Sequence, residues 1–177
     1  MGQGFGLENA LWFAHDADDA FETPTFERNR SHDYVAREVE AVQNAVGGVE
    51  IANFSKHEFN GPGAHAYLNR ILAGRLPRPG RIALTPMLTP KGRLYGDLSV
   101  ACLNQDHFIL FGSGVMQEAH RRWFEKDLPD DVSYQNVSDD WHGIALSGPK
   151  SRELLSRLTR DDVSAEAFKF RDLRQTF

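Results

Sequence analysis

The stretch RIALTPMLTPKGRLYGDLSVACLNQDHFILFG, residues 81–112, contains three apolar-rich segments that are separated by short turns. We predict strands at 81–88, 93–103 and 107–111, because turn-forming Pro, Gly, Asn and Asp gather between them. Connections of this length join antiparallel neighbours, since a parallel crossover needs a dozen residues or more. The stretch therefore predicts an antiparallel meander.

Helical and extended segments flank this meander on both sides. Ser31 can serve as an N-cap and Gly47-Gly48 can end a helix, so a helix is predicted at 32–46. After the Gly112-Ser113-Gly114 turn we expect a helix at 115–127, with Met116, Ala119 and Trp123 facing inward. Further helices are predicted at 61–72 and 149–158, and further strands at 49–54, 57–60, 132–137 and 142–147.

An internal repeat supports the same fold class. GPGAHAYLNRI (61–71) and GPKSRELLSRL (148–158) share Gly-Pro, an apolar-Leu pair and an Arg before a final apolar residue, and each follows a predicted strand. Chance similarity between two helix starts is the alternative. A duplicated strand–helix unit, together with the meander, predicts an α+β fold with antiparallel sheets and flanking helices.

Composition excludes several classes of function. The net charge is −5 and the basic residues are scattered, which argues against a nucleic-acid partner. No apolar run approaches the roughly 20 residues that cross a bilayer, so we expect no membrane partner. The seven histidines show no metal-ligand spacing, and we expect no metal site. Cys102 is the only cysteine, and we expect it to be a small residue of the core. A single cysteine is consistent with a reducing compartment, and we expect a cytoplasmic protein.

Asp97 is the residue that most invites a chemical role, because Asp is unfavourable inside a strand. By strand alternation, Asp97, Ser99 and Ala101 face one side, with Tyr95 as a possible wall, while Leu98, Val100 and Cys102 face the other. The first set would leave room for a ligand, and the second would be core. The alternative is a solvent face on which Asp97 is simply exposed.

The Gly112-Ser113-Gly114 turn is the second candidate. Its backbone could approach a ligand closely, and the start of the following helix could hold an anion. A plain tight turn is the alternative.

The segment from Trp12 to Phe170 resembles the folate-binding aminomethyltransferase family, in which glycine-cleavage T-proteins belong. Three stretches carry the resemblance by their order and spacing: FSKHEFNGPGA (54–64), LTPMLTPKGRLYGDLSV (84–100) and GIALSGP (143–149). The opening FGLENALWF (5–13) and Ser113 look most like the folate domain of dimethylglycine and sarcosine dehydrogenases. The resemblance implies a linker or extension at 1–30 and the N-terminal part of the folate-binding domain at 31–177.

The resemblance also implies roles for individual residues. Asp97 matches the strand aspartate that lies beside the pterin, where a carboxylate would orient tetrahydrofolate and the aminomethyl donor, stabilise a developing cation and, if buried, move a proton. The cofactor would be tetrahydrofolate, the substrate a small amine and the product 5,10-methylenetetrahydrofolate. By strand position, the residues expected to line the folate cleft are Leu84, Ser99, Ala101, Gly112 and Ser113.

The departures from the family pattern leave other functions open. Glu50 and Ala52 stand where relatives have Asp and Ser, and the later Tyr-Thr-Gly-Glu-like motif does not occur. The chain reads as if cut after Arg174-Gln-Thr-Phe177. We therefore expect partners in a missing C-terminal half or a flavin dehydrogenase domain, which would hold any FAD. The alternatives are a non-catalytic folate-binding or interaction module, and a fragment that is inactive alone and self-associates through an open sheet edge.

Overall fold

The computed structural model describes residues 2–4 and 6–176, so Phe5 of the opening FGLENALWF segment and the two end residues of the chain lie outside the described residues. The chain divides into two compact units. Unit 1 comprises Met1–Gly48 and Leu146–Arg157, and unit 2 comprises Val49–Ala145 and Leu158–Phe177. The expected division into 1–30 and 31–177 stays a prediction.

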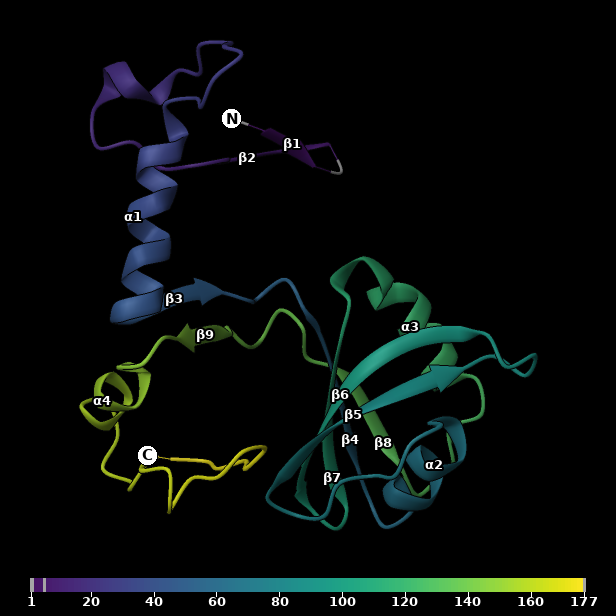
Figure 1. The fold of residues 1–177 in the computed structure, drawn as a ribbon. Helices are drawn as coiled ribbons and strands as arrows, with labels where there is room; N and C mark the ends of the chain where they lie inside the picture. The colour runs from purple at the N-terminus through teal and green to yellow at the C-terminus, as the bar shows by residue number, and fades with distance from the viewer. Residues whose placement is uncertain (1, 5, 177) are drawn as a thin grey trace. The chain divides into compact units, whose positions relative to one another are not determined.

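Helices and strands are mixed along the chain, and antiparallel pairing dominates (Figure 1), which confirms the α+β class. The strands are β1 Gly2–Gly4, β2 Leu7–Asn9, β3 Gly47–Glu50, β4 Ser55–Asn60, β5 Arg81–Leu88, β6 Leu94–Asn104, β7 His107–Gly112, β8 Ser133–Asn136 and β9 Ile144–Ser147. The helices are η1 Ala17–Ala20, α1 Ser31–Asn44, α2 Ala64–Ile71, η2 Gly114–Met116, α3 Gln117–Glu125 and α4 Ser151–Ser156. Within the described part of the chain, no helix is long and apolar enough to cross a membrane.

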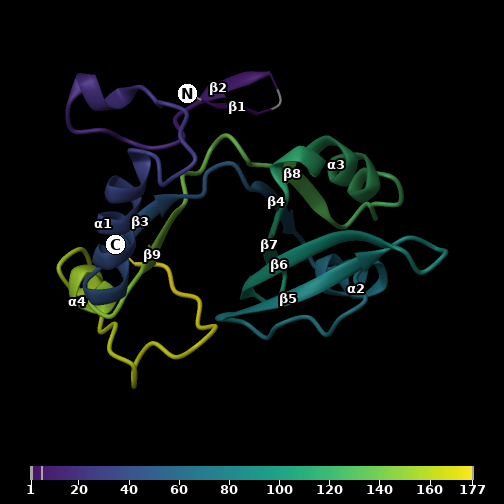
Figure 2. The ribbon, with the colours of Figure 1, turned by 45° about the horizontal axis from the view of Figure 1, so that its top comes forward.

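Unit 2 is built on a five-stranded sheet with the order β5-β6-β7-β4-β8. Every neighbouring pair in this sheet is antiparallel. The predicted meander is β5, β6 and β7, with boundaries within one residue of the prediction, so this prediction is confirmed. Figure 2 shows the long β5–β6 hairpin beside α2 and α3.

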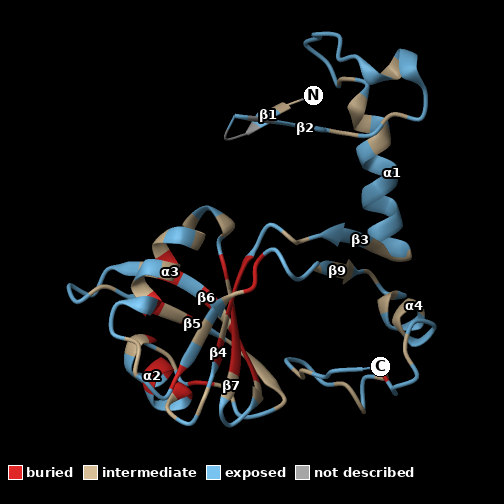
Figure 3. Cartoon of the chain, turned by 180° about the vertical axis from the view of Figure 1, so that it is seen from behind, coloured by how far each residue is buried: buried red, intermediate tan, exposed pale blue. Residues whose placement is uncertain are grey.

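The hydrophobic core of unit 2 lies on one face of this sheet, under α2 and α3, where most buried residues gather (Figure 3). Leu98, Val100 and Cys102 point into it from β6, as the alternation predicted.

The inward face predicted for the helix after Gly114 is wrong in part. Met116, Ala119 and Trp123 are only partly buried, whereas His120 and Phe124 are fully buried. A 3-10 turn at Gly114–Met116 precedes α3 and changes the phase of the helix.

Tyr95 does not stand on the same face as Asp97, which corrects the sequence interpretation. The β5–β6 register shifts between Met87 and Leu88, so that Met87 pairs with Gly96 and Leu88 with Leu94. Tyr95 is the extra residue of this bulge, and a bulge interrupts the two-residue alternation. Its ring packs instead 4.7 Å from the Trp123 ring, at the edge of the core.

The internal repeat is visible in the backbone. In each copy a strand, β4 or β9, leads through Gly-Pro into a short helix, α2 or α4. Both first glycines have positive φ, +129° at Gly61 and +115° at Gly148. A Cβ atom on Gly61 would lie 2.2 Å from the Asp131 carbonyl oxygen, and one on Gly148 would lie 2.5 Å from that of Ala45. The shared Gly-Pro therefore marks the same turn twice, which only glycine fits.

Unit 1 contains the β1–β2 hairpin, η1, α1 and α4. The predicted helix at 32–46 is α1, but the prediction that Ser31 caps it is wrong. Ser31 is the first helical residue, and its hydroxyl donates to the Asn29 side-chain oxygen at 2.6 Å instead of accepting from a helix N–H.

The core of unit 2 holds two buried histidines. His57 on β4 and His120 on α3 are 0% and 1% exposed, with ring centroids 6.1 Å apart. His57 Nδ1 lies 2.8 Å from the Tyr134 hydroxyl, and His57 Nε2 has no hydrogen-bond partner among the described residues. Burial, and secondarily the nearby His120, lower the pKa of His57 from 6.5 to about 4. His57 is therefore neutral at physiological pH, because burial disfavours its charged form.

Candidate functional site

The face of the five-stranded sheet opposite the core brings several predicted site residues into one row. Leu84 on β5 pairs with Ser99 on β6, Ser99 pairs with Phe111 on β7, and Phe111 pairs with Lys56 on β4. Side chains at paired positions point to the same face of a sheet. Leu84 is 60% exposed and Ser99 and Phe111 are partly exposed, so this row is accessible.

Asp97 lies on the same face, one row further along β6, where it pairs with Pro86. It is exposed and has no ion-pair partner among the residues that the structure describes. The described chain therefore does not supply the burial on which the proton-transfer interpretation depends. Ser113, also exposed, follows the end of β7 at this same end of the sheet.

A cavity of about 350 Å³ opens over the part of the row formed by Ser99, Phe111 and Lys56, and neither Leu84 nor Asp97 lines it. Ser99 and Phe111 form its base with Ile82 and Lys56. Its walls come from two connections, the one after β3 and the one before β9, through Ile51, Phe54, Trp141, His142 and Gly143. The Ile51 N–H donates to the Gly143 carbonyl at 2.8 Å, which joins the two connections. The volume and the aromatic lining suit a flat ring system.

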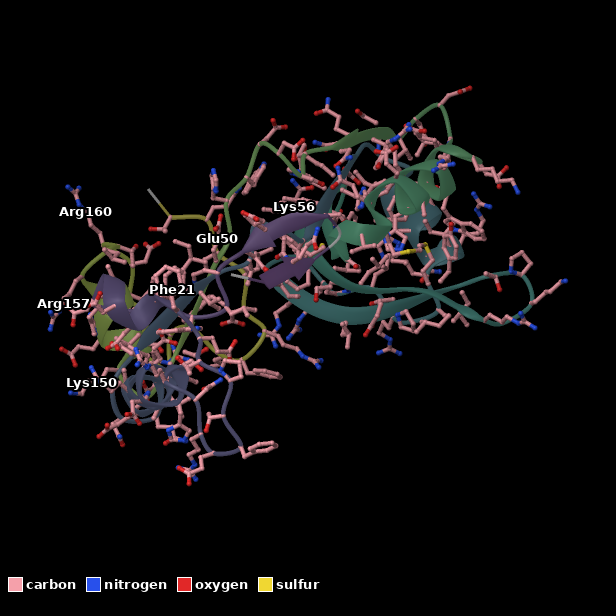
Figure 4. The ribbon with its side chains drawn as sticks, turned by 90° about the horizontal axis from the view of Figure 1, so that it is seen from above. Phe21, Glu50, Lys56, Lys150, Arg157 and Arg160 are labelled. Atoms are coloured by element: carbon pink, nitrogen blue, oxygen red, sulfur yellow. The ribbon has the colours of Figure 1, made fainter. Side chains whose placement is uncertain are left out.

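Lys56 is buried beside this cavity, with 3% of its surface exposed (labelled in Figure 4). Its Nζ donates to the carbonyls of Ala52 at 2.8 Å, Phe54 at 2.9 Å and Ser138 at 3.2 Å. Three acceptors match the three donors of an ammonium group. No carboxylate lies in ion-pair range of Lys56 within residues 2–4 and 6–176. The side chain thus ties the two cavity walls together with a buried charge that no carboxylate balances.

Two predicted site residues lie apart from this row. Ala101 is on the same face but is 1% exposed, between Ile82 and Ile109 of the neighbouring strands. Gly112 is buried, and a Cβ atom there would point to the core, 2.8 Å from Leu98 and 3.2 Å from His120 Nδ1. The structure therefore brings together Leu84, Asp97, Ser99 and Ser113, and leaves Ala101 and Gly112 covered.

The sequence interpretation missed the aromatic residues around the cavity. Phe54 and Lys56 stand in a stretch that carries the family resemblance, and Phe111 alternates with core residues of β7, so a signal existed for these three. Trp141 lies about 40 residues from Ser99 along the chain, in a segment without a recognisable motif. Only the fold brings it to the cavity.

A larger hollow, of about 460 Å³, lies elsewhere in unit 2 and is lined by His65, Arg78, Cys102 and Asp106 among others. It contains none of the predicted ligand-contacting residues. Burial raises the pKa of the Cys102 thiol, so this cysteine is poorly suited to act as a nucleophile. Among the described residues, no group of three or more His, Cys, Asp or Glu could hold a metal ion. The smaller cavity over Ser99 and Phe111 is therefore the candidate site, and Ser99 is the predicted site residue that lines it.

Two kinds of enzyme resemble this chain in sequence. The mitochondrial dimethylglycine dehydrogenase of Mus musculus is 33% identical over 175 residues, which are 96% of this chain and 20% of that protein. An aminomethyltransferase of Chloroherpeton thalassium is 30% identical over 148 residues, 82% of this chain and 40% of that protein. The chain thus spans between a fifth and two fifths of the length of these relatives.

Solved structures agree on the fold. The glycine cleavage system aminomethyltransferase T of Bartonella henselae superimposes with a TM-score of 0.64 over 72% of this chain and 36% of that chain, at 20% identity. A heterotetrameric sarcosine oxidase from Corynebacterium sp. U-96 gives a TM-score of 0.53 over 78% of this chain and 69% of that chain, also at 20% identity. The family model described as the GCVT N-terminal domain matches residues 1–177, and the chain therefore belongs to the GCVT N-terminal domain family.

Proposed function

We propose that this chain forms one wall of a tetrahydrofolate site in an enzyme that transfers a one-carbon unit from an aminomethyl or N-methyl donor. The enzyme would be an aminomethyltransferase or a dimethylglycine or sarcosine dehydrogenase. The observation that carries the proposal is the cavity over Ser99 and Phe111, which opens on the same sheet face as Asp97. The relatives of this chain include a dimethylglycine dehydrogenase and an aminomethyltransferase.

The residues around the cavity fit a pterin. Phe54, Phe111 and Trp141 offer aromatic surfaces on which a flat ring can pack. Ser99 offers a hydroxyl that can both donate and accept at the ring edge. Tetrahydrofolate, when bound, supplies the nitrogen that accepts the one-carbon unit.

Asp97 would then act on the donor. Its carboxylate lies on the same face with no competing ion pair among the described residues, so it is free to attract a cationic amine and to stabilise positive charge that develops on it. Water would be excluded from Asp97 only by ligand or by protein beyond the described residues, since Asp97 is exposed here. The small amine substrate, a further domain or subunit as partner, and FAD held outside this chain remain parts of the proposal.

The compartment is also a proposal. We keep the expectation of a cytoplasmic protein on the basis of the single cysteine. The dimethylglycine dehydrogenases among the relatives are described as mitochondrial. Fractionation of cells that express the native gene would decide between the two.

Isothermal titration of tetrahydrofolate into the unaltered chain tests the site. In a Ser99→Phe variant, the added ring would occupy the base of the cavity, and we expect binding to weaken by at least about tenfold, equivalent to about 1.4 kcal/mol. Ser133→Phe, at an exposed position of β8 outside the cavity, is the matched control and should bind as the unaltered chain does. Equal binding by the Ser99 and Ser133 variants would show that the ligand does not use this cavity.

A further inference from the structure

Two charged side chains lie on the sheet face of the candidate site: Lys56 lines the cavity, and Asp97 lies on the same face outside the cavity lining. Asp97 on β6 and Lys56 on β4 occupy the same sheet face, with Ser99 and Phe111 between them. Two residues along a strand and two strands across a sheet place their backbones about 12 Å apart. This span is comparable with the length of an extended ligand made of a ring and a short side arm.

The ammonium group of Lys56 has no free donor for a ligand, so any influence on a ligand is through its electrostatic field. All three of its donors are taken by the carbonyls of Ala52, Phe54 and Ser138, so none is left to bind a ligand directly. A buried charge that has no carboxylate partner in the described chain is weakly screened by water. The Lys56 end of the cavity is therefore a positive region lined by apolar surface.

We propose that Lys56 determines ligand specificity, by favouring ligands that carry a carboxylate or another anionic group at its end of the cavity while a cationic amine is held beside Asp97 on the same sheet face. This rests on the proposed function, because it names the charge pattern of the ligand that the same cavity takes. A neutral ring without an anionic arm would gain nothing from Lys56, and a cationic ligand would be repelled from that end.

Two probes separate the charge from the ring. Tetrahydrofolate carries two carboxylates on its side arm, and 6-methyltetrahydropterin has the same ring system without them. We would measure the affinity of both probes for the unaltered chain, for Lys56→Met, which removes the charge at similar length, and for Lys56→Arg, which keeps it. Lys91→Met, at an exposed position of the β5–β6 turn, is the control.

We expect Lys56→Met to weaken tetrahydrofolate binding by about tenfold and the pterin by less than about twofold, and to lose most of the salt dependence of tetrahydrofolate binding. Lys56→Arg should keep the ratio of the two affinities within about threefold of the unaltered chain. Because the ratio is taken within one variant, a smaller folded fraction cancels from it.

Equal weakening of both probes by Lys56→Met would overturn the specificity role and leave Lys56 as a link between the cavity walls, with the folate site intact. If the ratio of tetrahydrofolate to pterin affinity falls in Lys91→Met as much as in Lys56→Met, the specificity role of Lys56 is overturned too. Binding of neither probe to the unaltered chain would overturn the proposed function itself, so the two failures are distinguishable.

Discussion

Replacing the buried His57 by Phe should make the stability of the protein less sensitive to acid. His57 is fully buried, and its ring lies 5.0 Å from that of Phe124 and 6.0 Å from that of Tyr134. The groups that face it are His120 and Glu118 on α3 and Tyr134 on β8, and of these His120 opposes its protonation while Glu118 favours it. A proton on His57 Nε2 would also be a buried donor without a partner among the described residues.

The sign follows from the pKa of His57, which is 6.5 in the unfolded chain and about 4 in the folded protein. Between these values the unfolded chain binds the proton and the folded protein does not, so stability is full above pH 6.5 and falls as the pH drops towards 4. Each pH unit between the two pKa values corresponds to about 1.4 kcal/mol of unfolding free energy. Between pH 7 and pH 5 the loss due to His57 is therefore about 2 kcal/mol.

Urea unfolding, followed by circular dichroism at pH 7, 6 and 5, measures this loss. The unaltered protein should lose about 2 kcal/mol more between pH 7 and pH 5 than His57→Phe, because only the former has an imidazole that must give up its proton on folding. His65→Gln, at an exposed histidine, should keep the full pH dependence. If His57→Phe loses as much stability on acidification as the unaltered protein, the assignment of a neutral, desolvated His57 is refuted.

The remaining predictions concern the site and the frame around it. In the enzyme that we propose, Asp97→Asn should lower the rate of methylenetetrahydrofolate formation by about a hundredfold or more while tetrahydrofolate affinity changes little. Turnover that survives with folate binding lost would rule out the catalytic role. Gly61→Ala should destabilise the protein by more than about 1 kcal/mol in urea unfolding, because a Cβ there meets the Asp131 carbonyl. The loss should exceed that of Gly92→Ala, where φ is also positive but nothing lies within 4 Å of the added Cβ. Asp172→Asn removes the ion pair with Arg81 and weakens the acceptor of the Lys169 N–H. Limited proteolysis should therefore cut residues 158–176 sooner than in the unaltered protein, and an unchanged cleavage rate would contradict this.

Local patterns predicted much of the frame. The meander of β5, β6 and β7 could be predicted because short polar turns separate apolar segments, and short turns admit only antiparallel neighbours. The Gly-Pro repeat could be predicted because a positive-φ glycine leaves a signature in the sequence.

The errors have physical causes that sequence periodicity does not carry. The predicted face of Tyr95 is wrong because a bulge interrupts the alternation, and the bulge depends on how β5 and β6 pair. His120 was not expected in the core, since a histidine is buried only where a specific neighbour, here the carbonyl of Tyr95 at 3.1 Å from Nε2, compensates one nitrogen.

The candidate site could be predicted in part, because some of its residues follow from local patterns and others depend on long-range contacts. Strand alternation places Asp97 and Ser99 on one face, which the register confirms, and Leu84, which the resemblance alone suggested, pairs with Ser99 on that face. The walls of the cavity come from connections far apart in the sequence, and long-range contacts such as Lys56 with Ser138 and Ile51 with Gly143 bring them together. Ala101 lies on the predicted face but is covered, because strand alternation gives direction and not exposure.

The measurement that tests the central claim most directly is chemical-shift mapping of tetrahydrofolate on the ¹⁵N-labelled chain. The account predicts that the largest changes occur at the amides of Leu84, Asp97, Ser99 and Phe111 and at the indole N–H of Trp141, and that they saturate together. Changes confined to the hollow around His65 and Arg78, or no saturable change, would contradict it.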